Sequence, residues 1–197
     1  MKVIHTLEFL HGMASVRRYS QTKLVNDESV LEHTGFVGVV SYFIALHLMN
    51  QGEEINLGVL FAKAMAHDME EVVVGDIPRP TKYHNERVKS ALREVEKEAM
   101  DQIMDRIDVG NIYVDWITSK EGIEGEIVAT ADLIAVVYKA WQEIHIFGNK
   151  SMSNHIFGLH EHINSLIKKE KSFKDESHIK DILFQTQRIL SKLEEEL

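Results

Sequence analysis

The feature that most constrains the fold is the placement of proline. The chain of 197 residues contains only two prolines, Pro78 and Pro80, and they are almost adjacent. Because proline breaks the interior of a helix, long helices are possible on both sides of this point. Apolar residues recur at helical spacing over residues 3–13, 30–49, 56–74, 85–107, 121–146 and 176–195. We therefore predict an all-α protein, folded as one helical bundle over residues 1–197.

The start of the second expected helix is well marked. Ser29-Val30-Leu31-Glu32 has the pattern of a capping box, with Ser29 at the N-cap and Glu32 three positions later. His33 follows in the first turn and faces the apolar side of the helix. A lone histidine at such a position is more often a satisfied core residue than a metal ligand, so His33 by itself decides nothing.

The run Ala66-His67-Asp68-Met69-Glu70-Glu71 leaves an apolar segment, where an unpaired charge would be costly. A metal ion is the simplest partner for such a cluster. We expect one continuous helix over 56–74, which would place Glu71 one turn from His67 on the same face. Gly75 then ends the helix, and Asp76 leaves on the proline-stiffened loop of residues 76–83. A His-Asp dipeptide alone is weak evidence, because chance often produces one.

Three other places carry polar groups of interest. Arg18 and Tyr19 lie in a loop that could hold a phosphate and pack on a sugar or base, or could be a solvated connector. Arg79 and Lys82 are the natural phosphate-binding cations near the acids. Asp132 lies in the most apolar part of the helix over 121–146, where we expect it to be buried, as a metal ligand or as a hydrogen-bonded structural residue.

Composition excludes several classes of function. The net charge of −9 argues against a nucleic-acid polymer as the main partner, though not against a small phosphate ligand. The absence of cysteine excludes disulfides, thiolate metal sites and cysteine nucleophiles. No apolar run reaches membrane-spanning length by inspection, and His5 and Glu8 interrupt what would be a signal core. We expect a cytoplasmic protein without a membrane partner.

The set His33, His67-Asp68 and Asp132, each on a different expected helix, resembles the HD-domain metal-dependent phosphohydrolase superfamily, whose pattern is H…HD…D. Further pieces look like its branch of bacterial YfbR-like 5′-deoxyribonucleotidases. These pieces are Val30-Leu31-Glu32-His33, His67-Asp68-Met69-Glu70-Glu71-Val72, Gly75-Asp76-Ile77-Pro78, Thr81-Lys82-Tyr83 and Ala131-Asp132. The resemblance covers about residues 8–165, and the C-terminal helix over 176–195 lies outside it. It implies a single HD domain.

The resemblance also implies roles. One divalent transition metal (Mn, Co, Fe, Ni or Zn) would be held by His33, His67, Asp68 and Asp132. Glu71 would orient or deprotonate water, Arg18 would orient the phosphate, and Asp76 would contact the sugar and assist the leaving group. The implied substrate-binding set is Arg18, Tyr19, Asp76, Ile77, Pro78, Arg79 and Lys82. Relatives are commonly dimeric, so a homodimer is expected; the apolar residues Ile156, Phe157 and Leu159 would serve either an interface or the core.

The expected reaction is removal of the 5′-phosphate from deoxyribonucleoside monophosphates. Two departures from the family pattern bear on it: Tyr19 stands where tryptophan is frequent, and Arg79 stands where a small polar residue is usual. The first concerns discrimination between deoxyribose and ribose. The second would favour a substrate with more phosphates, so the alternative is a dNTP triphosphohydrolase. A non-catalytic nucleotide-binding HD module would have no need for Glu71 and Asp76 beside the four ligands. A helical bundle without a metal would have to bury four polar residues at separate places with separate partners: His33, His67, Asp68 and Asp132.

Overall fold

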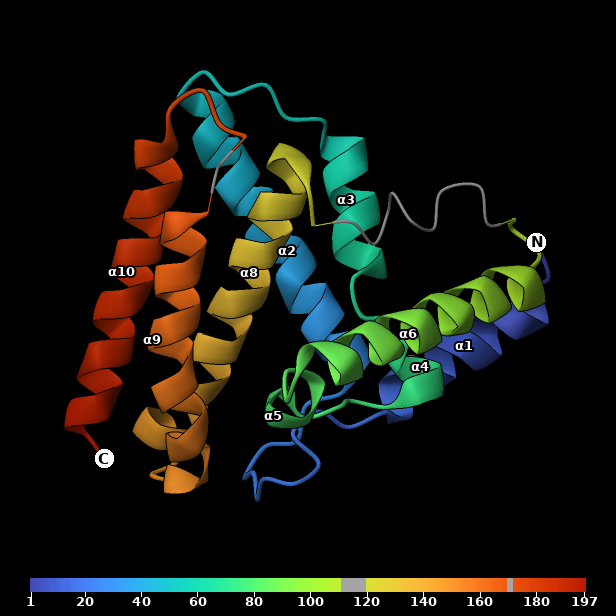
Figure 1. Ribbon diagram of the computed structural model, residues 1–197, viewed down its shortest axis with the longest axis horizontal. Coiled ribbons are helices and arrows are strands. Elements are labelled where there is room, and N and C mark those ends of the chain that lie inside the picture. The colour runs from blue at the N-terminus through green and yellow to red at the C-terminus, as the bar shows by residue number, and fades with distance from the viewer. Residues whose placement is uncertain (111–119, 170–171) are drawn as a thin grey trace. The chain divides into compact units, whose positions relative to one another are not determined.

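The computed structural model describes residues 1–110, 120–169 and 172–197 (Figure 1). Within these ranges the regular structure is helical, apart from one isolated antiparallel bridge between Arg17 and Ser29. The helices are α1 (Val3–Ser15), α2 (Val30–Asn50), α3 (Leu57–Ala66), α4 (Glu71–Val74), α5 (Arg79–Lys82), α6 (Glu86–Ile107), α8 (Gly122–Trp141), η1 (Gln142–Ile146), η2 (Lys150–Met152), α9 (Ser153–Lys168) and α10 (Glu176–Glu195). The all-α prediction is therefore confirmed.

The chain divides into two compact units. The described part of the first consists of residues 1–21, 27–35 and 65–110, and that of the second of residues 22–26, 36–64, 120–169 and 172–197. Helix α2 begins in the first unit and continues in the second. The assignment of the chain to a single domain stays a prediction.

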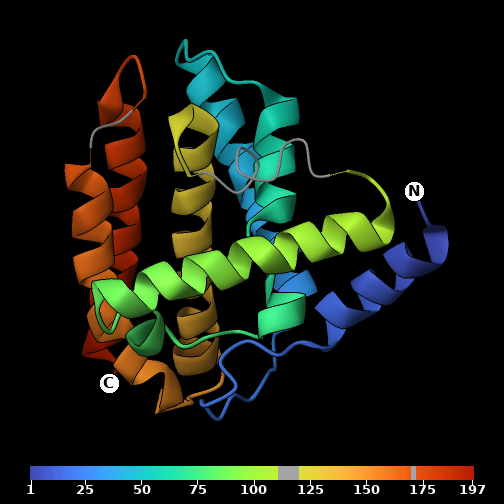
Figure 2. The ribbon, with the colours of Figure 1, turned by 45° about the vertical axis from the view of Figure 1, so that its right-hand side comes forward.

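In the first unit α1, α4 and α6 pack against one another (Figure 2). Their shared core contains Ala66, Met100, Ile103 and Ile107, with Phe9, Met69 and Met104 packed against it. The helix predicted over residues 3–13 is present as α1, but its apolar residues are packed only in part. Phe9 is packed, whereas Ile4 and Leu7 are 61% and 57% exposed.

The capping box predicted at the start of α2 is present. The Glu32 carboxylate accepts hydrogen bonds from the backbone N–H of Ser29 at 2.8 Å and from its hydroxyl at 2.7 Å. The Glu32 backbone N–H in turn donates to Ser29 Oγ at 3.2 Å. These bonds satisfy amide groups that a helix leaves unpaired at its start, so they fix where α2 begins.

Helix α2 corrects one expectation. An 18-residue stretch of this 21-residue helix has a mean hydropathy of 1.3, so by length and composition the helix could cross a membrane. The expectation that no run reaches that length was wrong. Core helices of globular proteins meet the same criterion, and 44% of this stretch is buried within the protein.

The expected continuous helix over residues 56–74 is also wrong. Helix α3 ends at Ala66, a turn covers residues 67–70, and α4 begins at Glu71. The turn tightens because amides bond to carbonyls three residues back, as in Met69 N–H to Ala66 O and Glu71 N–H to Asp68 O, both at 3.3 Å. His67 and Asp68 therefore lie in a turn between two helices.

In the second unit α8, α9 and α10 lie side by side (Figure 1). The sequence did not predict α9, although α8 and α10 match the expected helices closely. Ile156 and Leu159 of α9 are buried, so they belong to the core and offer no interface. The Phe157 side chain lies outside the described residues.

A buried ion pair joins the last turn of α8 to η1. Lys139 Nζ and Glu143 Oε1 are 3.0 Å apart, with side chains 2% and 0% exposed. The Glu143 carboxylate also accepts hydrogen bonds from the backbone N–H groups of Val25 and Asn26, and Lys139 donates to the Asn26 carbonyl. Buried charges need several hydrogen-bond partners to offset the loss of water, and here residues 22–26 supply them. The ion pair therefore holds residues 22–26 against η1.

Candidate metal centre

Backbone pairing between the two ends of the α1–α2 connection brings polar side chains together in the first unit. The Arg18 N–H donates to the Glu28 carbonyl at 2.9 Å, and the Val30 N–H donates to the Val16 carbonyl at 3.1 Å. These two bonds flank the bridge between Arg17 and Ser29. Arg18 and Glu28 therefore lie opposite each other, directly before the helix that carries His33.

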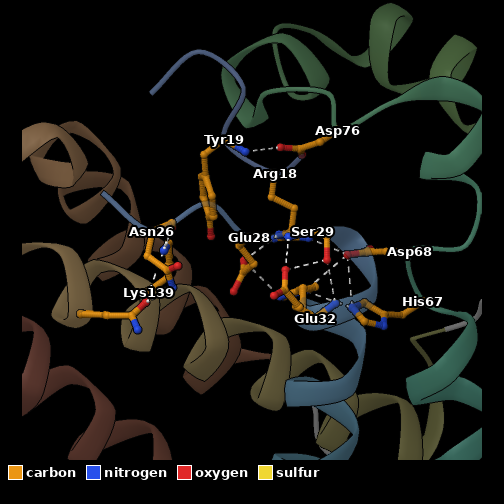
Figure 3. Close-up of polar contacts among 12 residues, drawn as sticks. Arg18, Tyr19, Asn26, Glu28, Ser29, Glu32, His67, Asp68, Asp76 and Lys139 are labelled. Carbon is orange, nitrogen blue, oxygen red and sulfur yellow. Dashed lines mark hydrogen bonds and ion pairs between the residues drawn. The ribbon is translucent and has the colours of Figure 1, made fainter. Parts of the chain in front are cut away.

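Three potential ligands converge beside this pairing. His33 Nε2 lies 3.2 Å from His67 Nε2. Asp68 Oδ2 lies 3.4 Å from His33 Nε2 and 3.2 Å from His67 Nε2. The two histidines are 0% and 8% exposed, so the group is largely shielded from water. Figure 3 shows His67 and Asp68 directed towards the residues at the start of α2.

This triangle fits a metal ion. Ligand atoms about 2.0–2.2 Å from one ion are about 2.8–3.6 Å apart when adjacent in tetrahedral or octahedral coordination. All three separations fall in that range. Two imidazoles and a carboxylate also form the mixed nitrogen and oxygen donor set that divalent transition metals prefer.

Asp68 is ionised in this setting. Burial is the largest single influence and raises the pKa of its carboxyl, but the combined effects of His67, His33 and Arg18 outweigh it. The pKa is consequently held well below its usual range. The ligand is thus in the charge state that metal binding requires.

Two acids beside the ligands point to a missing positive charge. Burial, followed by the Asp68 charge, raises the pKa of Glu70 to about 8 and that of Glu71 to about 9. One carboxylate oxygen of each, Oε2, is buried without a hydrogen-bond partner among the described residues. A cation at the three ligands would lower both pKa values, because a nearby opposite charge favours the ionised carboxylate. The residues present therefore fit a divalent metal.

Arg18 and Tyr19 border the metal ligands. Arg18 Nη1 donates to Asp68 Oδ2 at 2.8 Å, and Arg18 is 9% exposed. The Tyr19 N–H donates to Asp76 Oδ2 at 2.7 Å, and the Arg18 guanidinium lies 5.4 Å from the centre of the Tyr19 ring. Tyr19 adopts a φ of 56°, a left-handed conformation that is unusual for a tyrosine. The structure thus brings three predicted site residues, Arg18, Tyr19 and Asp76, into one cluster.

The loop after Asp76 holds the remaining predicted substrate residues. Gly75 has a φ of 75°, which ends α4 and turns the chain towards Ile77 and Pro78, both partly buried. Lys82 Nζ lies 2.6 Å from Glu96 Oε1 on α6, so its charge is already engaged. Arg79 is exposed, and its guanidinium lies 5.1 Å from the centre of the Tyr83 ring.

Asp132 belongs to the second unit, on α8. Its side chain is 23% exposed and its Oδ2 lies 3.7 Å from Lys120 Nζ. Asp132 is therefore partly buried, where the sequence predicted a buried aspartate. Its role as the fourth ligand stays a prediction.

Sequence reasoning missed Glu28. Its Oε2 lies 3.3 Å from Arg18 Nε and 3.9 Å from His33 Nδ1, and its side chain is only 15% exposed. Glu28 stands directly before the capping box, where acids are common for helix-dipole reasons. The bridge that brings it to Arg18 joins Arg17 and Ser29, twelve positions apart, and leaves no periodic pattern in the sequence.

The architecture is that of the HD-domain phosphohydrolases. An HD-domain phosphohydrolase from Listeria innocua superposes with a TM-score of 0.67 at 21% identity, covering 98% of this chain and 99% of that one. The cyanophage S-2L HD phosphohydrolase DatZ, solved with dA and one catalytic Zn²⁺ ion, superposes with a TM-score of 0.62 at 16% identity and covers 98% of this chain and 99% of that one.

Sequence comparison narrows the class to a family. The model of the 5′-deoxynucleotidase YfbR-like family matches residues 5–179. A 5′-deoxynucleotidase of Vibrio vulnificus is 30% identical over 167 residues, 81% of each chain. The 5′-deoxynucleotidase YfbR of Salmonella paratyphi B is 30% identical over 165 residues, covering 81% of this chain and 79% of that one. This chain belongs to the YfbR-like 5′-deoxynucleotidases, a family of hydrolytic enzymes.

Proposed function

We propose that this protein removes the 5′-phosphate from deoxyribonucleoside monophosphates at a site built around one divalent transition metal. The observation that carries the proposal is the convergence of His33, His67 and Asp68 beside the buried Glu71 carboxylate. The names of the curated relatives support the substrate class, and the dA and Zn²⁺ of the cyanophage neighbour support a deoxynucleoside and a metal. Asp132 would be the fourth ligand.

When bound, the metal would polarise a phosphoryl oxygen and acidify a water molecule. Glu71 would orient that water and accept its proton, since its Oε2 is buried and has no other hydrogen-bond partner among the described residues. Removal of the proton produces the nucleophile that attacks phosphorus, and the bond from phosphorus to the 5′-oxygen breaks.

Arg18 would hold the phosphate. Its guanidinium has five N–H donors, and the contacts to Asp68 and Glu28 engage only part of them. Tyr19 and Asp76 would contact the sugar, and Asp76 would assist departure of the 5′-oxygen. The bond between the Tyr19 N–H and the Asp76 carboxylate keeps these two residues together.

The proposal is tested by product analysis with Mn²⁺ or Co²⁺ and the substrates dAMP, AMP and dATP. We expect orthophosphate from dAMP and little reaction with AMP. Release of tripolyphosphate from dATP as the main reaction would replace the proposal with the triphosphohydrolase alternative. No product from any of the three, with metal shown to be bound, would favour a nucleotide-binding module.

The observation that favours the triphosphohydrolase is Arg79, an exposed cation at the start of α5, directly after the Asp76-Ile77-Pro78 loop. If Arg79 binds additional phosphates, Arg79→Thr should lower kcat/KM for dATP about tenfold or more and leave dAMP unchanged, because charge-assisted bonds to phosphate are strong. Competition assays with both substrates give the ratio directly. An unchanged ratio would remove Arg79 from substrate selection.

We also propose a cytoplasmic homodimer. The surface that supports a dimer is an exposed apolar face of α2, where Val39, Phe43 and Leu46 are 56%, 63% and 40% exposed. Their spacing of four and three residues places them on one side of the helix. Phe43→Glu should convert the dimer to a monomer at micromolar concentration, measured by analytical ultracentrifugation. Phe184→Glu on α10, also at an exposed phenylalanine, is the control and should leave the mass unchanged.

A further inference from the structure

We propose that Glu28 is a positioning residue that prepares His33 and Asp68 for the metal. The inference rests on the proposed metal site but concerns a residue outside its ligand set. Glu28 is not one of the three converging ligands. It acts through His33 on one side and Arg18 on the other.

The first action concerns the proton on His33. Nε2 of this imidazole faces His67 and Asp68, so it must be unprotonated to bind a metal, and the ring proton must then reside on Nδ1. Nδ1 lies 3.9 Å from Glu28 Oε2, which is within ion-pair range but longer than a hydrogen bond. The Glu28 charge therefore favours the Nδ1–H tautomer electrostatically and leaves the Nε2 lone pair for the metal.

The second action concerns competition for Asp68. Arg18 Nη1 donates to Asp68 Oδ2 at 2.8 Å, and this oxygen is the one that faces both histidines. Arg18 and a metal ion would therefore share a single ligand atom. Glu28 pairs with Nε of the same guanidinium. It therefore neutralises part of the Arg18 charge and weakens the attraction of Arg18 for Asp68. Without Glu28, Arg18 would bind Asp68 more strongly and oppose the metal.

The backbone makes this arrangement rigid. The Arg18 N–H to Glu28 carbonyl bond and the adjacent bridge fix the two side chains on opposing segments (Figure 3). The capping box then starts α2 at the next residues, so the distance along the chain from Glu28 to His33 is set by helix geometry. A side chain placed by two independent constraints, and only 15% exposed, is suited to orient others.

The test compares Glu28→Gln and Glu28→Asp with the unmodified protein, using Co²⁺ affinity from chelator competition and the His33 tautomer from long-range ¹H–¹⁵N NMR of the metal-free protein. We expect Glu28→Gln to weaken Co²⁺ binding about 10- to 100-fold, as loss of such supporting groups does elsewhere. It should also populate the Nε2–H tautomer of His33. Glu28→Asp keeps the charge and should restore much of the affinity.

The matched control is Glu86→Gln, which removes the same charge from an exposed acid of α6 that pairs with Lys89. It should leave both readouts unchanged. Glu28→Gln with unaltered Co²⁺ affinity and an unaltered His33 tautomer would overturn the inference. If the unmodified protein binds no Co²⁺, the proposed function fails, and the tautomer measurement on metal-free protein still decides the role of Glu28.

Discussion

Replacing Glu71 with glutamine should lower kcat about 10²- to 10⁴-fold, which is the usual contribution of a general base. Glutamine preserves the size of the side chain but cannot accept a proton from water. Because Glu71 is not among the three converging ligands, Co²⁺ affinity should remain within about threefold of the unmodified value. The measurement is steady-state release of phosphate from dAMP, together with chelator competition on the same preparations.

Glu86→Gln provides the control for this variant. Glu86 is an exposed acid at the start of α6 that pairs with Lys89, so its neutralisation should leave turnover and metal binding intact. Full activity in Glu71→Gln would show that another group takes the proton. Loss of metal together with activity would instead make Glu71 a ligand.

Removing the metal should have the second large effect. A ligand present at a hundred times its Kd stabilises the folded state by about 2.7 kcal/mol. For a chain of this size that corresponds to a rise in Tm of about 5–10 °C on adding metal to the stripped protein. His67→Ala should abolish the rise, because it removes one corner of the triangle. Differential scanning calorimetry with and without Co²⁺ measures it.

The same experiment examines the fourth ligand. Asp132→Ala should reduce the metal-induced rise in Tm if Asp132 completes the site, and a full rise in this variant would exclude it. His145→Ala is the control, since His145 is an exposed residue whose imidazole pairs with Glu196. If the unmodified protein melts at the same temperature with and without metal, the polar residues of the first unit serve the fold alone.

Local signals in the sequence predicted local structure well. The capping box of Ser29 and Glu32 marked the start of α2 correctly because its bonds span only three residues. The break after Ala66 was missed because the apolar pattern continues through Met69 and Val72, while the turn depends on how His67 and Asp68 are placed. Helical periodicity does not distinguish such a turn from a continuous helix.

The site was predicted only in part for a similar reason. The motif residues His33, His67 and Asp68 meet as expected, and Arg18, Tyr19 and Asp76 cluster beside them. Contacts between distant segments, such as Lys82 with Glu96 or Glu28 with Arg18, depend on tertiary packing and leave no mark on spacing. The sequence therefore identifies candidate ligands, but it does not identify the residues that orient these ligands or pair with their charges.

Whether the site at His33, His67 and Asp68 supports turnover is measured by phosphate release from dAMP during titration of Mn²⁺ or Co²⁺ into metal-free protein, with AMP in parallel. We predict no turnover without metal, a linear rise up to one equivalent and a plateau beyond it, with AMP spared. Turnover of dAMP that does not depend on added metal would contradict the proposed role of the site at His33, His67 and Asp68.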